Sequence, residues 1–304
     1  MKMKFIIAAM VIGVLLRVSS VMAQPEYGED LPRLVTTDWL AANLEMKDLR
    51  IIDMRDSVKA YWENHIPGAV YVHPDALRWP DAGVPVKLMP LKDFADLLER
   101  LGISRNTYVV VYGEAGDYKA PYFLWALDYI GHKYAGIVDG GFTKWQNEQR
   151  PLTQDYPKIR PQSYSVSAFR TQHGVRAELG DVKYAVQTGD TLILDARPHE
   201  LYTGEQGPWK RLGHIKGARH HFWGDDLNPD GTFKTEDALK KVYDELGITD
   251  DTRVIVSCGQ GQMSAHTYFV LRYILGHKRV KNYDAGFNEW SNIEDLPTGK
   301  ILIK

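Results

Sequence analysis

The sequence holds a single cysteine, Cys258, among its 304 residues. One thiol cannot close an intramolecular disulfide, form a CxxC redox pair or build a multi-cysteine zinc site. Cys258 is therefore a packed core thiol, one half of an intermolecular bridge, or a reactive group. Because a lone cysteine is most often buried and inert, a reactive role needs support from the residues around it.

The chain also lacks an excess of charge of either sign. Its 37 basic and 39 acidic residues give a formal net charge of −2, which argues against nucleic acid as the main partner. The hydrophobic fraction of 44%, with 8 Trp and 17 Tyr, is typical of a folded globular protein and argues against disorder. His220 and His221 are adjacent, but no acidic or cysteine ligands stand at suitable spacing, so we expect no metal site.

Long apolar runs are absent except at the N-terminus. Lys2 and Lys4 precede an apolar run over residues 5–16, and small residues end the pattern at Ala23. This order is typical of a secretory signal, and the run is shorter than the roughly 20 residues of a spanning helix. We expect residues 1–23 to be a cleaved signal peptide and the mature protein to be exported, periplasmic in a Gram-negative source and not held in a membrane. An uncleaved anchor is the alternative.

The rest of the chain contains an internal repeat, two copies of one sequence module. Gly102 and Gly247 begin matching segments 145 residues apart, and the same offset aligns Val109-Val110-Val111 with Val254-Ile255-Val256 and Trp145 with Trp290. Chance similarity does not hold one offset over such a distance, so the repeat predicts two tandem domains. We place them at residues 31–150 and 164–304, joined by a proline-containing linker at 151–163.

Each copy alternates β-branched runs with helical patterns. In the second copy, strands are expected over 191–194 and 253–257. Helices are expected over 236–246, with Thr235 as N-cap and an apolar face of Ala238, Leu239, Val242 and Leu246, and over 264–275. This alternation predicts an α/β fold in which each domain is a mostly parallel sheet flanked by helices.

The residues that carry chemistry follow the strand over 253–257. Cys258 stands at the carboxyl end of that strand, where ligand sites of open α/β sheets lie, and the segment Gly259-Gln260-Gly261-Gln262-Met263 leads into a helix. A short loop with two glycines can turn several backbone N–H groups toward one point, and the helix adds its positive end. We expect Cys258 to react as a thiolate there.

These motifs resemble those of the rhodanese family of sulfurtransferases in its tandem two-domain form. The similar segments include Asp195-Ala196-Arg197, Gly213-His214-Ile215-Lys216-Gly217-Ala218, the Cys258-Gly-Gln-Gly loop and Ser264-Ala265-His266-Thr267. The resemblance implies that Cys258 takes sulfur from a small anionic donor such as thiosulfate, becomes a persulfide, and passes the sulfur to a thiol or cyanide acceptor. It implies no metal and no organic cofactor.

Only the second copy carries a nucleophile, because the offset places Gly113 opposite Cys258. The first domain is expected to be catalytically inactive, to pack against the second and to help form the wall of its cleft. A separate binding role for it is the alternative.

The Cys258 loop departs from many related loops in having no basic residue, since Gly259 and Met263 stand at the usual positions. We expect the donor's charge to be met by Arg197, Lys210 or Arg211. For Arg197 the alternative is a structural pair with Asp195, and for the other two a solvated surface pair. Thiosulfate is the preferred donor and 3-mercaptopyruvate the second.

Two alternative functions stay open. The protein could be a sulfane-sulfur carrier or binding module that delivers to a protein acceptor without turnover. A cysteine phosphatase uses a similar loop, but it needs an arginine at the far end of the loop, where Met263 and Ser264 stand.

Overall fold

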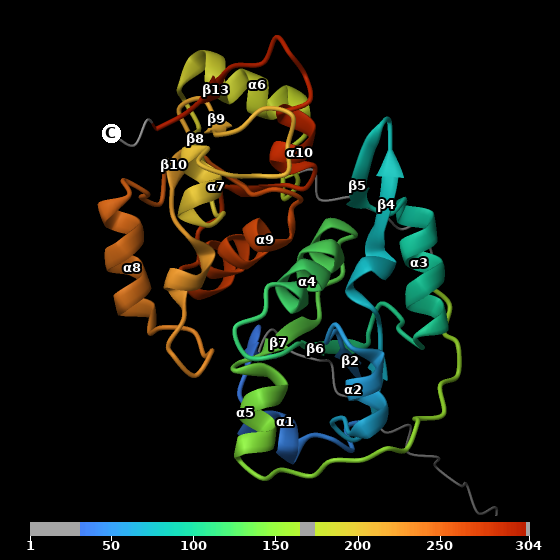
Figure 1. Cartoon of the computed structure of the whole chain (residues 1–304). Coiled ribbons are helices and arrows are strands. Elements are labelled where there is room, and N and C mark those ends of the chain that lie inside the picture. Colours follow the sequence, from blue (N-terminus) through green and yellow to red (C-terminus); the bar gives the residue numbers. More distant parts are fainter. Residues whose placement is uncertain (1–30, 165–173, 302–304) are drawn as a thin grey trace, which may run out of the picture. The chain divides into compact units, whose positions relative to one another are not determined.

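The computed structural model describes residues 31–164 and 174–301. The chain from Leu31 onward forms one compact unit, whose elements are labelled in Figure 1. The predicted signal peptide, residues 1–23, lies outside the described residues. Within the described ranges, no helix is long and apolar enough to cross a membrane.

A five-stranded parallel sheet forms the centre of the first half. Its strands run in the order β1-β7-β6-β2-β3, and every neighbouring pair is parallel. Their bounds are β1 (Leu34–Val35), β2 (Leu49–Asp53), β3 (Ala69–Tyr71), β6 (Tyr108–Tyr112) and β7 (Ala135–Val138). The Tyr-Val-Val-Val-Tyr sequence of β6 is buried at every position, as expected of a central strand covered on both faces.

A four-stranded parallel sheet occupies the second half. Its order is β10-β8-β11-β12, and the strands are β8 (Leu192–Asp195), β10 (Arg219–His220), β11 (Val254–Ser257) and β12 (Val280–Tyr283). The strands predicted over 191–194 and 253–257 are confirmed to within one residue as β8 and β11. Two antiparallel pairs complete the β-structure, and they are β4 (Arg78–Asp81) with β5 (Val84–Leu88), and β9 (His214–Ile215) with β13 (Thr298–Gly299).

Helices flank both sheets. Those of the first half are α1 (Thr37–Ala42), α2 (Val58–Glu63), α3 (Leu91–Arg100), α4 (Lys119–Tyr129) and α5 (Gly141–Asn147). Those of the second half are α6 (Leu179–Thr188), α7 (His199–Thr203), α8 (Glu236–Glu245), α9 (Gln262–Phe269) and α10 (Gly286–Trp290). Short 3-10 turns lie at η1 (Pro74–Leu77) and η3 (Trp223–Asp226), and a π turn, η4 (Val270–Ile274), continues α9.

The helices predicted from sequence are confirmed with small differences. Thr235 caps α8 by accepting a hydrogen bond from the Ala238 N–H at 3.4 Å. The buried face of α8 differs in part from the predicted one. Leu239 is buried as predicted, but Ala238 is exposed and Tyr243 is buried in addition. The helix predicted from residue 264 begins two residues earlier, as α9.

The two halves share one hydrophobic core. Helices α4 and α9 follow corresponding loops of the two copies and pack against each other (Figure 1). Because its own sheet and α9 both cover it, α4 is buried around almost its whole surface. One cluster of buried side chains joins Phe123 and Trp125 of the first half with Tyr268 and Phe269 of the second.

A reciprocal pair of hydrogen bonds also links the halves. The carboxylate of Asp139, in the first half, accepts a hydrogen bond from the backbone N–H of Phe233 at 2.9 Å. The carboxylate of Asp284, its counterpart 145 residues later, accepts one from the backbone N–H of Leu88 at 2.6 Å. Each copy therefore anchors a backbone segment of the other.

The segment predicted as the linker packs on the first half. Thr153 forms an antiparallel bridge with His65, Trp145 donates to the carbonyl of Pro151 at 2.9 Å, and the buried Tyr164 donates its N–H to Glu99 at 2.8 Å. The boundaries at 150 and 164 stay predictions, since the described chain clusters as one unit.

Candidate active site

Cys258 directly follows β11 and is 2% exposed. Its Sγ atom accepts hydrogen bonds from the Gly261 N–H at 3.1 Å and the Gln260 N–H at 3.4 Å. The Ser264 hydroxyl lies 3.4 Å from Sγ, but its one hydrogen has a closer acceptor in Asn282 Oδ1 at 2.6 Å. β11 has parallel partners on both sides, so the thiol lies at the middle of the carboxyl edge of the sheet. Two backbone N–H groups thus converge on the sulfur, an arrangement suited to stabilising an anion.

Two glycines make the tight loop possible. Gly261 has φ +82°, and a Cβ there would lie 2.6 Å from the Asp284 carbonyl oxygen. Gly286 has φ +59°, and a Cβ there would lie 2.6 Å from the carbonyl oxygen of Cys258. That approach allows the Phe287 N–H to bond the Cys258 carbonyl at 2.7 Å. A side chain at either position would push the loop away from the chain beside it.

A cavity of about 170 Å³ opens at the thiol. It is lined by Tyr118, Arg197, Leu201, Trp209, Cys258, Gly259, Gln260, Gln262 and Met263. The predicted loop residues thus meet at one place, with Gly261 beside them as a donor to Sγ. The cavity is smaller than the ~300 Å³ at which sites for drug-sized ligands begin, so it suits a small substrate.

Arg197 forms the structural pair with Asp195 and also lines the cavity. Its Nε and Nη2 atoms donate to the Asp195 carboxylate at 2.6–3.1 Å, and Nη2 also donates to the carbonyl of Gly213 at 2.8 Å. Its Nη1 is buried and has no hydrogen-bond partner among the described residues. Because the side chain also lines the cavity, Arg197 is a structural partner of Asp195 that can still offer a donor to an anion.

Lys210 and Arg211 do not reach this cavity. Arg211 donates to five backbone carbonyls, those of Trp290, Ser291, Ile293, Glu294 and Leu296, at 2.5–3.2 Å. Lys210 is 59% exposed and pairs with Glu294 at 2.6 Å. This placement corrects the expectation that they bind the donor: Arg211 holds the C-terminal segment in place, and Lys210 forms a surface pair.

Two aromatic residues of the cavity were missed by the sequence analysis. Trp209 lies in the loop between α7 and β9. The guanidinium carbon of Arg197 lies 4.9 Å from the centroid of the Trp209 ring. Tyr118 comes from the first half, and its ring meets Trp223 edge-on at 5.1 Å. Burial raises the pKa of Tyr118, so it stays protonated at neutral pH. The loop that carries Trp209 is longer in the second copy than in the first, and this difference could have pointed to a part in the site. No feature of the sequence around Tyr118 could have done so.

In the corresponding loop of the first half, the side chain of Asp117 occupies the space beside Gly113. At Gly113, the counterpart of Cys258, an added Cβ would overlap the carboxylate of Asp117. That carboxylate accepts a hydrogen bond from the Lys119 N–H at 2.7 Å. Burial raises the pKa of Asp117 to about 6. The first copy therefore keeps the loop but places an internal carboxylate where the second copy has a thiol.

His266 does not line the cavity at Cys258. Its ring is fully buried, stacked on Phe233 at 4.9 Å and edge-on to Trp223 at 5.1 Å. Burial lowers the pKa of His266 to about 4. Of the neighbouring pair considered for a metal, His221 hydrogen-bonds Asp226 at 2.7 Å, and within residues 31–164 and 174–301 no group of three His, Cys, Asp or Glu could hold a metal ion.

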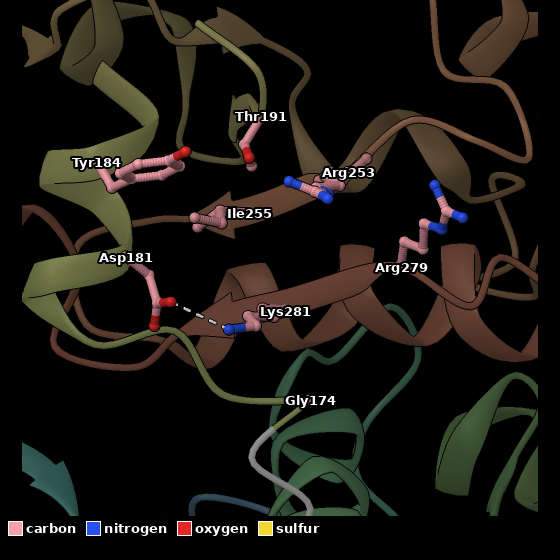
Figure 2. A pocket seen from close by; sticks show the side chains of 9 residues that line it. Gly174, Asp181, Tyr184, Thr191, Arg253, Ile255, Arg279 and Lys281 are labelled. Atoms are coloured by element: carbon pink, nitrogen blue, oxygen red, sulfur yellow. Dashed lines mark hydrogen bonds and ion pairs between the residues drawn. The ribbon is translucent and has the colours of Figure 1, made fainter. Parts of the chain in front are cut away.

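A larger cavity of about 510 Å³ lies elsewhere in the second half (Figure 2). Arg253 and Arg279, which line it, precede β11 and β12, so it lies toward the amino ends of these strands. Its cations already have partners: Arg253 pairs with Asp190 at 3.2 Å, and Lys281 with Asp181 at 3.1 Å. Since none of the described residues that line it is a cysteine, this cavity does not compete with the Cys258 site.

Comparison with known proteins agrees with the repeat and the site. The rhodanese-like domain family matches the chain twice, at residues 36–148 and 178–293. The sulfur carrier protein TtuD of Thermus thermophilus is 37% identical, over 88% of this chain and 96% of the relative. The thiosulfate sulfurtransferase of Corynebacterium glutamicum is 33% identical, over 87% of this chain and 89% of the relative.

Among solved structures, the 3-mercaptopyruvate sulfotransferase SseA of Escherichia coli matches with a TM-score of 0.76 and 28% identity, covering 84% of this chain and 98% of SseA. The two domain matches, the relatives along most of the chain and the thiol at the sheet edge lead to one conclusion. The chain belongs to the rhodanese family and is a two-domain sulfurtransferase.

Proposed function

We propose that the protein transfers sulfane sulfur from thiosulfate, with 3-mercaptopyruvate as the second donor, to cyanide or a thiol through a persulfide on Cys258. The observation that carries this proposal is the pair of backbone N–H groups that donate to Sγ, those of Gly261 at 3.1 Å and Gln260 at 3.4 Å. The same donors that stabilise a thiolate can stabilise the terminal sulfur of a persulfide, because both are anions.

The two half-reactions balance without a cofactor. The Cys258 thiolate attacks the outer sulfur of thiosulfate, the sulfur–sulfur bond breaks, and sulfite leaves with the electron pair. The thiolate or cyanide acceptor then attacks the terminal sulfur of the persulfide, and Cys258 leaves again as a thiolate. Arg197, through the Nη1 atom that the Asp195 pair leaves open, is positioned to meet the donor's charge.

The cavity favours thiosulfate over 3-mercaptopyruvate. Sulfite departs as an anion and needs no proton, whereas breaking the carbon–sulfur bond of 3-mercaptopyruvate leaves a carbon that must be protonated. Three of the described residues that line the cavity carry an ionisable proton, Tyr118, Cys258 and Arg197. Cys258 reacts as the thiolate and the guanidinium of Arg197 does not deprotonate, so Tyr118 is the proton donor left. Burial raises the pKa of Tyr118, which makes it a poor acid.

Intact-protein mass spectrometry tests the persulfide. After treatment with thiosulfate we expect a mass gain of about 32 Da, one sulfur atom, located on Cys258 and reversed by cyanide. Cys258→Ser provides the matched control and should show no gain. If neither thiosulfate nor 3-mercaptopyruvate adds sulfur to the folded protein, the proposal is wrong.

A carrier function is the second candidate, favoured by the relative that is itself named a sulfur carrier. A carrier would load sulfur but turn over slowly with cyanide or small thiols. Steady-state rates with thiosulfate and cyanide separate the two, because an enzyme should release sulfite repeatedly while a carrier should stop after one equivalent.

We also propose that the protein is exported to the periplasm. The charged, apolar and small-residue order of residues 1–23 supports this. N-terminal sequencing of the protein made in a Gram-negative host should begin at Gln24. An intact Met1 on membrane-bound protein would instead support the anchor.

A further inference from the structure

The Cys258 loop has no basic residue of its own, yet a cation of the first half reaches it. Arg78 is the first residue of β4, and its side chain is largely buried. Its Nη2 atom donates to the backbone carbonyl of Gln260 at 2.8 Å and lies 3.3 Å from the Gln260 side-chain oxygen. Gln260 directly precedes Gly261 in the loop.

The bonded carbonyl belongs to the peptide group whose N–H faces the thiol. The Gln260 C=O and the Gly261 N–H form one planar unit and point in opposite directions, because the peptide is trans. The Gly261 N–H makes the shortest hydrogen bond to Sγ, at 3.1 Å. A hydrogen bond that holds the carbonyl therefore also sets the direction of the N–H toward the sulfur.

Arg78 also acts on the strength of that donor. A charged donor on the carbonyl polarises the peptide and makes its N–H a better hydrogen-bond donor, as in hydrogen-bond chains. Through the polarised peptide, the positive charge of Arg78 favours an anionic sulfur without touching it. This compensates for the basic side chain that the loop lacks at Gly259 and Met263.

The hairpin that carries Arg78 is fixed at a second point. Arg78 pairs with Leu88 across β4 and β5, and the Leu88 N–H bonds the carboxylate of Asp284 at 2.6 Å. The hydroxyl of Tyr122 also donates to Asp284, at 2.9 Å, while the guanidinium of Arg78 lies 5.3 Å from the Tyr122 ring. The hairpin thus contacts both sides of Gly261, whose backbone lies against Asp284.

We propose that Arg78 is a positioning residue for sulfur transfer, which aligns and polarises the Gln260–Gly261 peptide and so stabilises the anionic sulfur on Cys258 from the first half of the chain. This inference rests on the proposed function for its role in turnover. Its effect on the thiolate itself is independent of any donor.

The test measures the pH midpoint of Cys258 alkylation by iodoacetamide in the full-length mature protein and in three Arg78 variants. We expect Arg78→Met and Arg78→Gln to move the midpoint to higher pH and to slow sulfur loading from thiosulfate roughly 10-fold, less than removing a direct oxyanion donor costs. Arg78→Lys should recover most of both, since it keeps the charge and one donor.

Arg33→Met is the matched control. Arg33 is also an arginine of the first half that touches the second, lying 4.7 Å above the Tyr273 ring, but its described polar contacts are with Ala135 and Asp128 and not with the Cys258 loop. Thermal melting confirms that each variant is folded, and Arg78→Gln serves if Arg78→Met is not. Midpoints of the Arg78 variants equal to that of Arg33→Met would overturn the proposal. If the wild type loads no sulfur, the proposed function fails, while the alkylation midpoints still decide the role of Arg78.

Discussion

At the scale of single residues, Arg197 is both a buried ion-pair partner and part of the cavity wall. Its pair with Asp195 is matched in the first half by Arg55 and Asp53, with Nη2–Oδ2 distances of 2.6 and 2.7 Å. All four side chains are almost fully buried. Since the half without a cysteine has the same pair, the pair itself is structural, and any contact of Arg197 with a donor is left to Nη1, which has no hydrogen-bond partner among the described residues.

Replacing either arginine should cost stability, but only one should affect the donor. Arg197→Ala and Arg55→Ala each leave a buried aspartate unpaired, so the free energy of unfolding should fall by about 3–5 kcal/mol in both. In protein that remains folded, Arg197→Ala should raise the KM for thiosulfate about 10-fold, the loss of one hydrogen bond to a charged group. Urea unfolding and steady-state kinetics measure the two effects. Equal KM values for the two variants would contradict a role for Arg197 in donor binding.

At the scale of elements, the strand–loop–helix unit is built in the same way in both halves. The Phe142 N–H bonds the Gly113 carbonyl at 2.8 Å, and the Phe287 N–H bonds the Cys258 carbonyl at 2.7 Å. Gly141 and Gly286 have φ of +57° and +59°, and a Cβ on either would lie 2.6 Å from the corresponding carbonyl oxygen. The backbone of the unit is therefore independent of whether it carries a thiol.

This equivalence gives a matched pair of glycine variants. Gly286→Ala and Gly141→Ala should both lower the melting temperature, because each puts a side chain at positive φ and against a carbonyl, at a cost of at least about 1 kcal/mol. Only Gly286→Ala should slow sulfur loading, roughly 10-fold, because it displaces the donors to Sγ. Stopped-flow loading with thiosulfate provides the measurement. A similar loss in Gly141→Ala would mean that stability, and not loop geometry, limits the rate.

The elements and the thiol could be predicted from sequence because their signals are local. The sequence itself shows the β-branched run before Cys258 and the glycines after it. It also shows that the repeat places Gly113 opposite Cys258. Trp209 and Arg78 were not predicted as parts of the site, because their contacts join residues far apart in sequence, 182 positions in the case of Arg78 and Gln260. Arg211 was misassigned for the same reason, since the carbonyls that bind it lie about 80 residues away.

At the scale of the whole molecule, buried titratable groups couple stability to pH. Burial lowers the pKa of His132 and of His266 to about 4, and burial raises the pKa of Asp117 to about 6. As pH falls below 6.5, the unfolded histidines bind protons that the folded ones do not, so stability is lost toward pH 4. Asp117 acts in the opposite sense, because its stabilising contribution is present at low pH and is lost as pH rises to about 6.

Asp117→Asn should therefore steepen the rise in stability between pH 4 and 6. Between these pH values the folded protein holds a proton on Asp117 that the unfolded chain does not. Removing the carboxyl therefore increases the slope of the unfolding free energy against pH by up to about 1.4 kcal/mol per pH unit. Urea unfolding at several pH values, for wild type and variant, measures the difference between the slopes. His132→Gln should change the slope in the opposite direction and serves as the control. Parallel curves for wild type and Asp117→Asn would contradict the assigned titration.

The reciprocal bonds of Asp139 and Asp284 have a consequence for the history of the chain. After a duplication, the first copy could lose its thiol with no loss of sulfur transfer, because the second copy retained one. It could not equally lose the hairpin, since the Asp284 carboxylate beside the other copy's loop accepts a hydrogen bond from the backbone N–H of Leu88, which any residue except proline could donate. A domain that has no cysteine of its own therefore still supports the loop that carries one, and the two copies cannot be separated without removing that support.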